Sequence, residues 1–199
     1  MVSSGVHIRD ESLLSYRSLL LSWIECIQDY ISVWDGDDLP YWYNERANVG
    51  ILAGAAWRSG MIALEEFQTI KVADDGEDSK GRNDLYLADK SIGAFIEAKV
   101  SFPNILNKKQ YTNLVKSQLF GALSDVRKIK DEGEKIGVVF VAPYSQSDRA
   151  NDEDVSKFIE ALPSFNVGAI AWCCPNMSQK HSSHDGKYYP VVALLFCRA

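Results

Sequence analysis

The chain has 199 residues, a length that fits one domain with a sizeable core. Its hydrophobic fraction of 46% and charged fraction of 24% are those of an ordinary globular protein, and they argue against disorder or a fibrous repeat. The formal net charge of −6 argues against a protein that coats nucleic acid with a uniformly basic surface, but it leaves room for a local basic cleft.

The sequence gives no sign of a membrane span or a secretory signal. No stretch approaches the roughly 18 uninterrupted apolar residues of a spanning helix. Arg9, Asp10 and Glu11 precede the first apolar stretch, which is unlike a signal peptide. The four cysteines lack the spacing of a disulfide framework. These features predict no membrane partner, reduced thiols and a cytoplasmic location.

Two helices are predicted in the N-terminal part. Apolar side chains recur at helical spacing over residues 11–33, and the Gly- and Pro-containing segment 35–40 ends that pattern. A second helix is predicted over residues 44–67, where no proline interrupts and Asn44 is a suitable N-cap. Glu45 falls in its first turn, where the helix dipole favours an acid. Glu45 either has only that local role or points toward the acids described next.

Residues 84–99 show the alternation of a β-hairpin, preceded by a short strand at 69–72 and a polar loop at 74–83. We take positions 90 and 91 as a two-residue turn, although Lys-Ser is not a preferred turn sequence. The pairings that follow are Asp89 with Ile92, Tyr86 with Phe95 and Asp84 with Glu97. A slip of one residue would send the two acids to opposite faces.

Two directly opposed carboxylates destabilise a sheet unless a cation lies between them. Lys99 follows Glu97 by two residues, so it shares that face of the strand and can supply one positive charge. A divalent ion would supply more, and Mg²⁺ usually takes only one or two protein carboxylates. The alternative is that Glu97 and Lys99 form a surface ion pair worth at most ~1 kcal/mol.

The remainder of the chain predicts a helix over 108–130, a buried strand over 136–142, a helix over 151–162 and strands over 167–173 and 189–196. The expected fold is α/β, a mixed sheet flanked by helices. We expect a single domain over 1–199, with residues 1–40 as an N-terminal helical extension packed on it. Between Lys99 and Lys130 the only acid is Asp125, so this segment is either a solvated helix face or a basic zone for phosphates.

The order of these elements resembles the PD-(D/E)XK nuclease superfamily, the restriction-endonuclease-like fold. The resemblance covers residues 44–142, a core of order αβββαβ, and its motif is Asp84 followed by Glu97-Ala98-Lys99. Asn83 stands where the motif name has Pro. No Gln-x-x-x-Tyr follows the motif, and Gln118 is the nearest candidate for a site glutamine.

The resemblance implies a Mg²⁺- or Mn²⁺-dependent nuclease that cleaves phosphodiester bonds, with DNA as the expected substrate. Metal ligands would be Asp84, Glu97 and the backbone carbonyl of Ala98, with Lys99 activating the attacking water and Glu45 holding a metal-bound water. Candidate substrate contacts are Lys108, Lys109, Lys116 and Gln118. The alternative is a catalytically silent nuclease-like fold that binds nucleic acid or protein. Members of this fold often work as dimers, so a homodimer is also considered.

Overall fold

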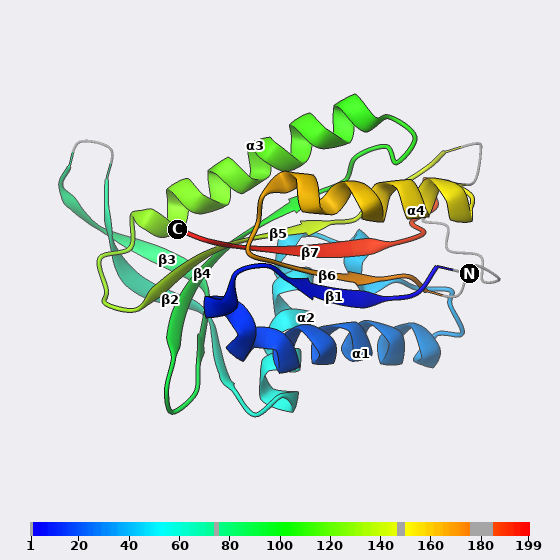
Figure 1. The fold of residues 1–199 in the computed structure, drawn as a ribbon. Helices are drawn as coiled ribbons and strands as arrows, with labels where there is room; N and C mark the ends of the chain where they lie inside the picture. The colour runs from blue at the N-terminus through cyan, green and yellow to red at the C-terminus, as the bar shows by residue number, and fades with distance from the viewer. Residues whose placement is uncertain (1, 74–75, 147–149, 176–184) are drawn as a thin grey trace.

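The computed structural model of the chain describes residues 2–73, 76–146, 150–175 and 185–199. Its centre is a seven-stranded mixed sheet of order β1-β6-β7-β5-β4-β3-β2 (Figure 1). The strands are β1 (Gly5–Ile8), β2 (Ile62–Val72), β3 (Asp78–Ala88), β4 (Gly93–Ser101), β5 (Glu134–Val141), β6 (Ala169–Cys173) and β7 (Val192–Arg198). Strands β4 and β5 are parallel, and the other neighbouring pairs are antiparallel.

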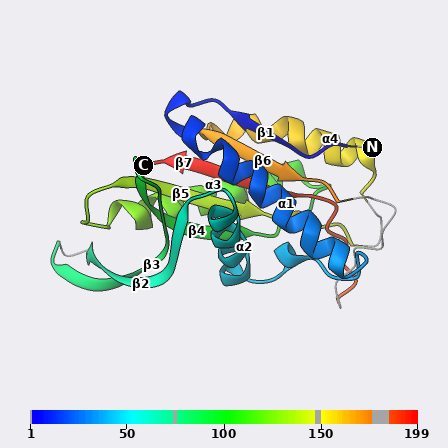
Figure 2. The ribbon, with the colours of Figure 1, turned by 90° about the horizontal axis from the view of Figure 1, so that it is seen from below.

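Helices cover both faces of the sheet. They are α1 (Arg17–Val33), α2 (Glu45–Arg58), α3 (Lys108–Arg127) and α4 (Asp152–Ala161), with short 3-10 turns η1 (Glu11–Tyr16), η2 (Pro40–Trp42) and η3 (Leu162–Phe165). One core cluster joins α1 and α2 to the sheet, and a second joins α3 and α4 to its other face. Figure 1 shows α3 and α4 above the sheet and α1 below it, and Figure 2 shows α1 and α2 from below. The α/β architecture predicted from sequence is therefore confirmed.

Most of the predicted elements are present near their expected positions. The helices predicted over 11–33, 108–130 and 151–162 correspond to η1 with α1, to α3 and to α4. The strands predicted over 136–142, 167–173 and 189–196 correspond to β5, β6 and β7. Helix α4 begins with a capping box, in which Asn151 and Asp154 each accept a hydrogen bond from the other's backbone N–H.

The helix predicted over 44–67 was wrong beyond residue 58. Helix α2 ends at Arg58, and Gly60 follows in the left-handed conformation with φ of 87°. The N–H of Met61 donates to the carbonyl of Ala56 at 2.9 Å, the pattern of a glycine-terminated helix end. Strand β2 then begins at Ile62. The chain therefore reverses from helix to strand within three residues.

The short strand over 69–72 and the loop over 74–83 were also wrong in extent. Strands β2 and β3 are each 11 residues long and pair from Ile62↔Ala88 to Val72↔Asp78. The outer part of this pair of strands is exposed and polar. The polar composition led to the prediction of a loop. Figures 1 and 2 show this hairpin projecting from the body of the molecule. Positions 74 and 75 of the predicted loop lie outside the described residues.

The N-terminal segment is built into the sheet and its core. Strand β1, which the sequence did not predict, pairs antiparallel with β6. Leu19, Leu20 and Trp23 of α1 are buried in the main core cluster. Within the described part of the chain, no helix is long and apolar enough to cross a membrane. The four cysteines, Cys26, Cys173, Cys174 and Cys197, are free thiols.

Candidate functional site

The hairpin formed by β3 and β4 has the register predicted from sequence. The N–H of Asp89 donates to the carbonyl of Ile92 at 2.9 Å, which closes the two-residue turn. Beyond the turn, Tyr86 lies opposite Phe95, as predicted. Regular pairing continues to Leu85↔Ile96. The predicted pairing of Asp84 with Glu97 lies one position beyond the last pair of this ladder.

Beyond Leu85 the carboxylate of Asp84 takes the place of a ladder hydrogen bond. Its Oδ2 accepts from the backbone N–H of Ala98 at 2.8 Å. The side chain of Asp84 is thus fixed against the Glu97-Ala98-Lys99 segment. Two of the acids that the sequence assigned to one site lie together.

Glu97 lies in the interior, with 5% of its side chain exposed. Burial raises the pKa of Glu97, the hydrogen bond from Lys71 opposes that rise, and the charge of Asp84 adds to it; the pKa reaches about 7. The Nζ of Lys71 lies 2.7 Å from Oε1 of Glu97. Lys71 therefore supplies the cation that two neighbouring carboxylates require.

Lys71 was not among the residues predicted for the site. It belongs to β2, which is two strands, about 10 Å, away from β4 in the sheet order. Its side chain crosses β3 at Gly81, where an added Cβ would come within 2.6 Å of the Lys71 Cδ. The one available signal was Gly81 itself, because a glycine inside a strand often marks a close approach.

Lys99 does not bridge the two acids as the sequence predicted. Its Nζ pairs with a carboxylate oxygen of Asp125 on α3 at 2.9 Å. A Cβ added at Gly121 of the same helix would lie 3.7 Å from the Lys99 Cε. Burial works against the charged ammonium, but the bond to Asp125 and the nearby acids together raise the pKa of Lys99. The charge of Lys99 still helps to lower the pKa of Glu97, but the direct partner of Glu97 is Lys71, which is distant in sequence.

Glu45 lies close to this cluster from the start of α2. Its helix is capped by Asn44, whose side chain accepts from the N–H of Ala47 at 3.1 Å. Burial raises the pKa of Glu45, the charge of Lys99 lowers it, and the charge of Asp84 raises it further. Glu45 is therefore near enough to interact with both residues. No direct hydrogen bond joins it to either in the described residues.

Two exposed arginines near these acids were also missed. Glu66 of β2 adopts a left-handed backbone conformation, with φ of 54°. Its carboxylate pairs with Arg46 at 3.3 Å and with Arg82 on β3. Arg46 directly follows Glu45, and Arg82 precedes Asp84 by two residues. Nothing in the local sequence predicts that one acid holds both guanidinium groups.

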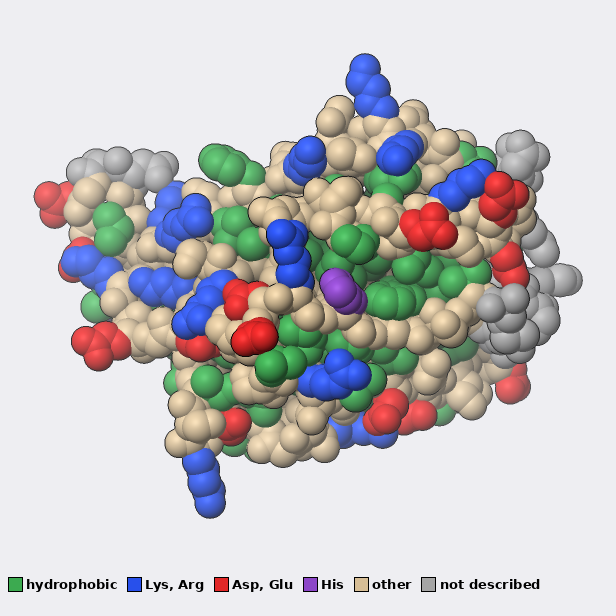
Figure 3. All heavy atoms as spheres, in the orientation of Figure 1, with side chains coloured by type: hydrophobic (Ala, Val, Ile, Leu, Met, Phe, Trp, Pro, Cys, Tyr) green, Lys and Arg blue, Asp and Glu red, His purple; other side chains and the backbone are tan. Residues whose placement is uncertain are grey.

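The substrate contacts predicted on α3 lie at different distances from the place where Lys99 meets this helix. Gly121 marks where Lys99 meets the helix, and Gln118 lies one turn before it. Lys116 is exposed, a further half turn back. Lys108 and Lys109 lie about 20 Å from Gly121 along the helix axis, so the structure does not bring them to the acids. Figure 3, in the orientation of Figure 1, shows the Lys and Arg side chains over α3 spaced apart, with other residues between them.

The donor atoms at the hairpin suit Mg²⁺ in kind. Asp84, Glu97 and the Ala98 carbonyl offer oxygen atoms, the ligands that this ion prefers. Within the described residues, no group of three or more His, Cys, Asp or Glu side chains is arranged to hold a metal ion. Both carboxylates instead have internal partners, the Ala98 N–H and Lys71. The oxygen donors are thus of the kind that Mg²⁺ prefers, and in this structure both carboxylates are engaged by groups of the protein itself.

Asn83, next to Asp84, is a buried polar residue without a partner. Its side chain is 0% exposed. Neither its amide oxygen nor its amide nitrogen has a hydrogen-bond partner in the described part of the chain. An unpaired buried group of this kind costs about 1–3 kcal/mol.

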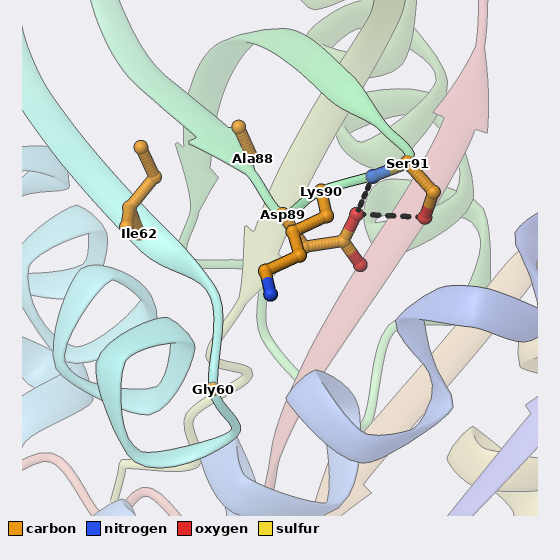
Figure 4. Close-up of a pocket in the computed structure, with 6 residues that line it drawn as sticks. All are labelled: Gly60, Ile62, Ala88, Asp89, Lys90 and Ser91. Atoms are coloured by element: carbon orange, nitrogen blue, oxygen red, sulfur yellow. Dashed lines mark hydrogen bonds between the residues drawn. The ribbon is translucent and has the colours of Figure 1, made fainter.

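A separate hollow of about 600 Å³ lies at the closed end of the hairpin (Figure 4). It is lined by Gly60, Ile62, Ala88, Asp89, Lys90 and Ser91. Asp89 and Asp84 are five residues apart on one strand and turn, about 17 Å. The hollow is therefore distinct from the acid cluster.

Comparisons of the chain with protein-family models, with curated proteins and with solved structures gave no match.

Proposed function

We propose that the chain is a Mg²⁺-dependent nuclease that hydrolyses phosphodiester bonds, with DNA as its expected substrate. The observation that carries the proposal is the contact of the Asp84 carboxylate with the backbone of Glu97-Ala98-Lys99, at 2.8 Å from the Ala98 nitrogen. The element order α2, β2, β3, β4, α3, β5 also supports a restriction-endonuclease-like core.

The residues of the cluster have separate roles in this proposal. Asp84, Glu97 and the Ala98 carbonyl would hold the ion, which when bound lowers the pKa of water and neutralises charge on the phosphate. Lys99 would stabilise the negative charge that develops on the phosphoryl oxygens. Glu45 would accept a hydrogen bond from a water at the site. Water adds to phosphorus and the bond to the leaving sugar oxygen breaks, which leaves one phosphomonoester and one hydroxyl end.

The basic residues nearest the cluster are the proposed phosphate contacts. Arg46 and Arg82 flank Glu45 and Asp84 in the sequence, and Glu66 holds both guanidinium groups on the same side of β2 and β3. Arginine suits this role because its planar group binds phosphate through two hydrogen bonds. Lys116 and Gln118 extend the contact along α3, and Lys108 and Lys109 would touch only a longer nucleic acid.

A cleavage assay tests the proposal. Supercoiled DNA, linear DNA and RNA are incubated with the protein in Mg²⁺ or Mn²⁺, and wild type is compared with Glu97→Ala and Lys99→Ala. We expect each variant to lose about 100-fold or more in rate. Glu153→Ala, which changes an exposed acid on α4, is the matched control and should retain full activity. The absence of cleavage with either metal, or undiminished cleavage in both variants, would refute the proposal.

The second candidate is a catalytically silent nuclease-like fold that binds nucleic acid or protein. The ion pair between Lys71 and Glu97 favours it, because a carboxylate neutralised by an internal lysine needs no metal. Fluorescence anisotropy with labelled DNA separates the two candidates. Binding that is equal in EDTA and in Mg²⁺, without cleavage, would support the silent fold.

A further inference from the structure

The ion pair between Lys71 and Glu97 is unusual because it is buried and because its two residues lie on strands that are not neighbours in the sheet. The Lys71 side chain is 17% exposed and that of Glu97 is 5% exposed, whereas ion pairs such as Arg58–Asp29 and Lys157–Glu153 lie on the surface. Holding two charges away from water is unfavourable unless their geometry is good. The 2.7 Å separation satisfies that condition. The pair thus joins β2, at one edge of the sheet, to a carboxylate of β4 in its interior.

The path of the lysine depends on Gly81. A Cβ at this position would lie 2.6 Å from the Lys71 Cδ and 2.8 Å from its Cγ. These are atoms in the middle of the side chain, so they cannot move aside without redirecting the ammonium group. Because glycine has no side chain, there is space over β3 at position 81, and the Lys71 side chain lies in that space.

The backbone around Lys71 is fixed on its other side. The N–H of Val72 donates to the carbonyl of Lys128 at 2.8 Å, and the N–H of Lys130 donates to the carbonyl of Ile70 at 3.0 Å. Lys71 itself forms an isolated bridge with Ile129. The segment after α3 therefore clamps the end of β2. The backbone of Lys71 is held in this way, whereas its ammonium group is held by the ion pair with Glu97.

We propose that Lys71 is an internal cation that closes the metal site. Its ammonium group pairs with the Glu97 carboxylate when no divalent ion is bound, and this ion pair must break before a divalent ion binds to Glu97. This inference rests on the metal site of the proposed function and adds its regulation. The ammonium and a divalent ion need the same carboxylate, and their like charges repel each other at such short range. Only molecules in which Lys71 has left Glu97 can bind the ion. The apparent affinity is therefore the intrinsic affinity multiplied by the fraction of such molecules.

Mn²⁺ binding tests this competition without any need for catalysis. Free Mn²⁺ is measured by electron paramagnetic resonance during titration of wild type and of Lys71→Met, which keeps the length of the side chain and removes its charge. We expect Lys71→Met to bind Mn²⁺ about 10-fold more tightly or better. Lys90→Met, which changes an exposed lysine in the hairpin turn, should bind as wild type does.

A second variant tests the same competition by displacing the Lys71 side chain instead of replacing it. Gly81→Ala keeps the charge of Lys71 but blocks its path, so it should also tighten Mn²⁺ binding. It keeps the proposal testable if Lys71→Met fails to fold, which a thermal melt would reveal. Equal or weaker Mn²⁺ binding in both variants would overturn the proposal, as would the absence of Mn²⁺ binding in every variant.

The outcomes also distinguish this inference from the nuclease proposal. Tighter Mn²⁺ binding in Lys71→Met without cleavage of any nucleic acid would support the internal cation and refute the nuclease. Metal-dependent cleavage with unchanged Mn²⁺ affinity in Lys71→Met and Gly81→Ala would refute the internal cation alone.

Discussion

Glu97 is the acid at the centre of the proposed site in the β3–β4 hairpin. It is buried, it lies beside Asp84, and it is held by a lysine from β2. Burial without compensation would keep a carboxyl group neutral, and Lys71 offsets part of that effect. The result is an acid that changes its charge near neutral pH. A group poised in this way is more frequent at functional sites than elsewhere.

The raised pKa of Glu97 predicts a pH dependence of stability. The folded-state pKa of about 7 exceeds the usual 4.5, so the folded protein binds the proton more tightly than the unfolded chain. The stability from this group is complete below about pH 4.5 and is lost as pH rises toward 7, by about 3 kcal/mol at most. Urea unfolding in EDTA from pH 4.5 to 8 should show this trend in wild type relative to Glu97→Gln. A free-energy difference that does not change with pH would contradict it.

The hairpin shows how one side chain can correct an unfavourable turn sequence. Lys-Ser does not favour a two-residue turn. The Oδ1 of Asp89 accepts hydrogen bonds from the Ser91 N–H at 2.7 Å, the Ser91 hydroxyl at 2.8 Å and the Ile92 N–H at 2.9 Å. These bonds lower the pKa of Asp89. They hold the turn in the register that brings Asp84 to Ala98.

Removing the Asp89 carboxylate should therefore weaken the hairpin. We expect Asp89→Ala to lower the melting temperature, because three donors in the turn lose their acceptor. Asp89→Asn keeps one acceptor oxygen and should lower the melting temperature less. Lys90→Ala, at an exposed position of the same turn, is the matched control. Equal melting temperatures for Asp89→Ala and Lys90→Ala would show that the turn does not depend on this side chain.

The sequence predicted the elements whose signal is local. Alternation and spacing identified the two strands of the β3–β4 hairpin, α3 and the buried strand β5, and the assumed turn at positions 90 and 91 gave the hairpin register. The sequence did not predict where α2 ends. The composition on both sides of Gly60 suits a helix, and the helix stops there because Gly60 has a positive φ. Nor did the sequence predict the partners of Glu97 and Lys99. Those partners, Lys71 and Asp125, come from separate elements that only the folded sheet brings into contact.

At the scale of the whole molecule, the N-terminal 40 residues complete the fold. Strand β1 forms one edge of the sheet, and α1 covers a sheet face together with α2. The ring of Tyr16 packs against that of Phe196 of β7 in a tilted arrangement, with centroids 5.9 Å apart, and its hydroxyl donates to Glu134 of β5 at 2.8 Å. The start of the chain is thus tied to the central strands. An element attached in this way should unfold together with the rest.

Adjacent leucines of α1 test that coupling. Leu20 is 0% exposed and Leu21 is 42% exposed. We expect Leu20→Ala to lower the free energy of unfolding by about 2–5 kcal/mol, since it leaves a cavity in the main core cluster, and Leu21→Ala to cost far less. If α1 is integral to the domain, hydrogen exchange of the β5 amides, such as that of Val138, accelerates in Leu20→Ala along with that of α1. Faster exchange in α1 with no change in β5 would instead mean that residues 1–40 form a separable extension.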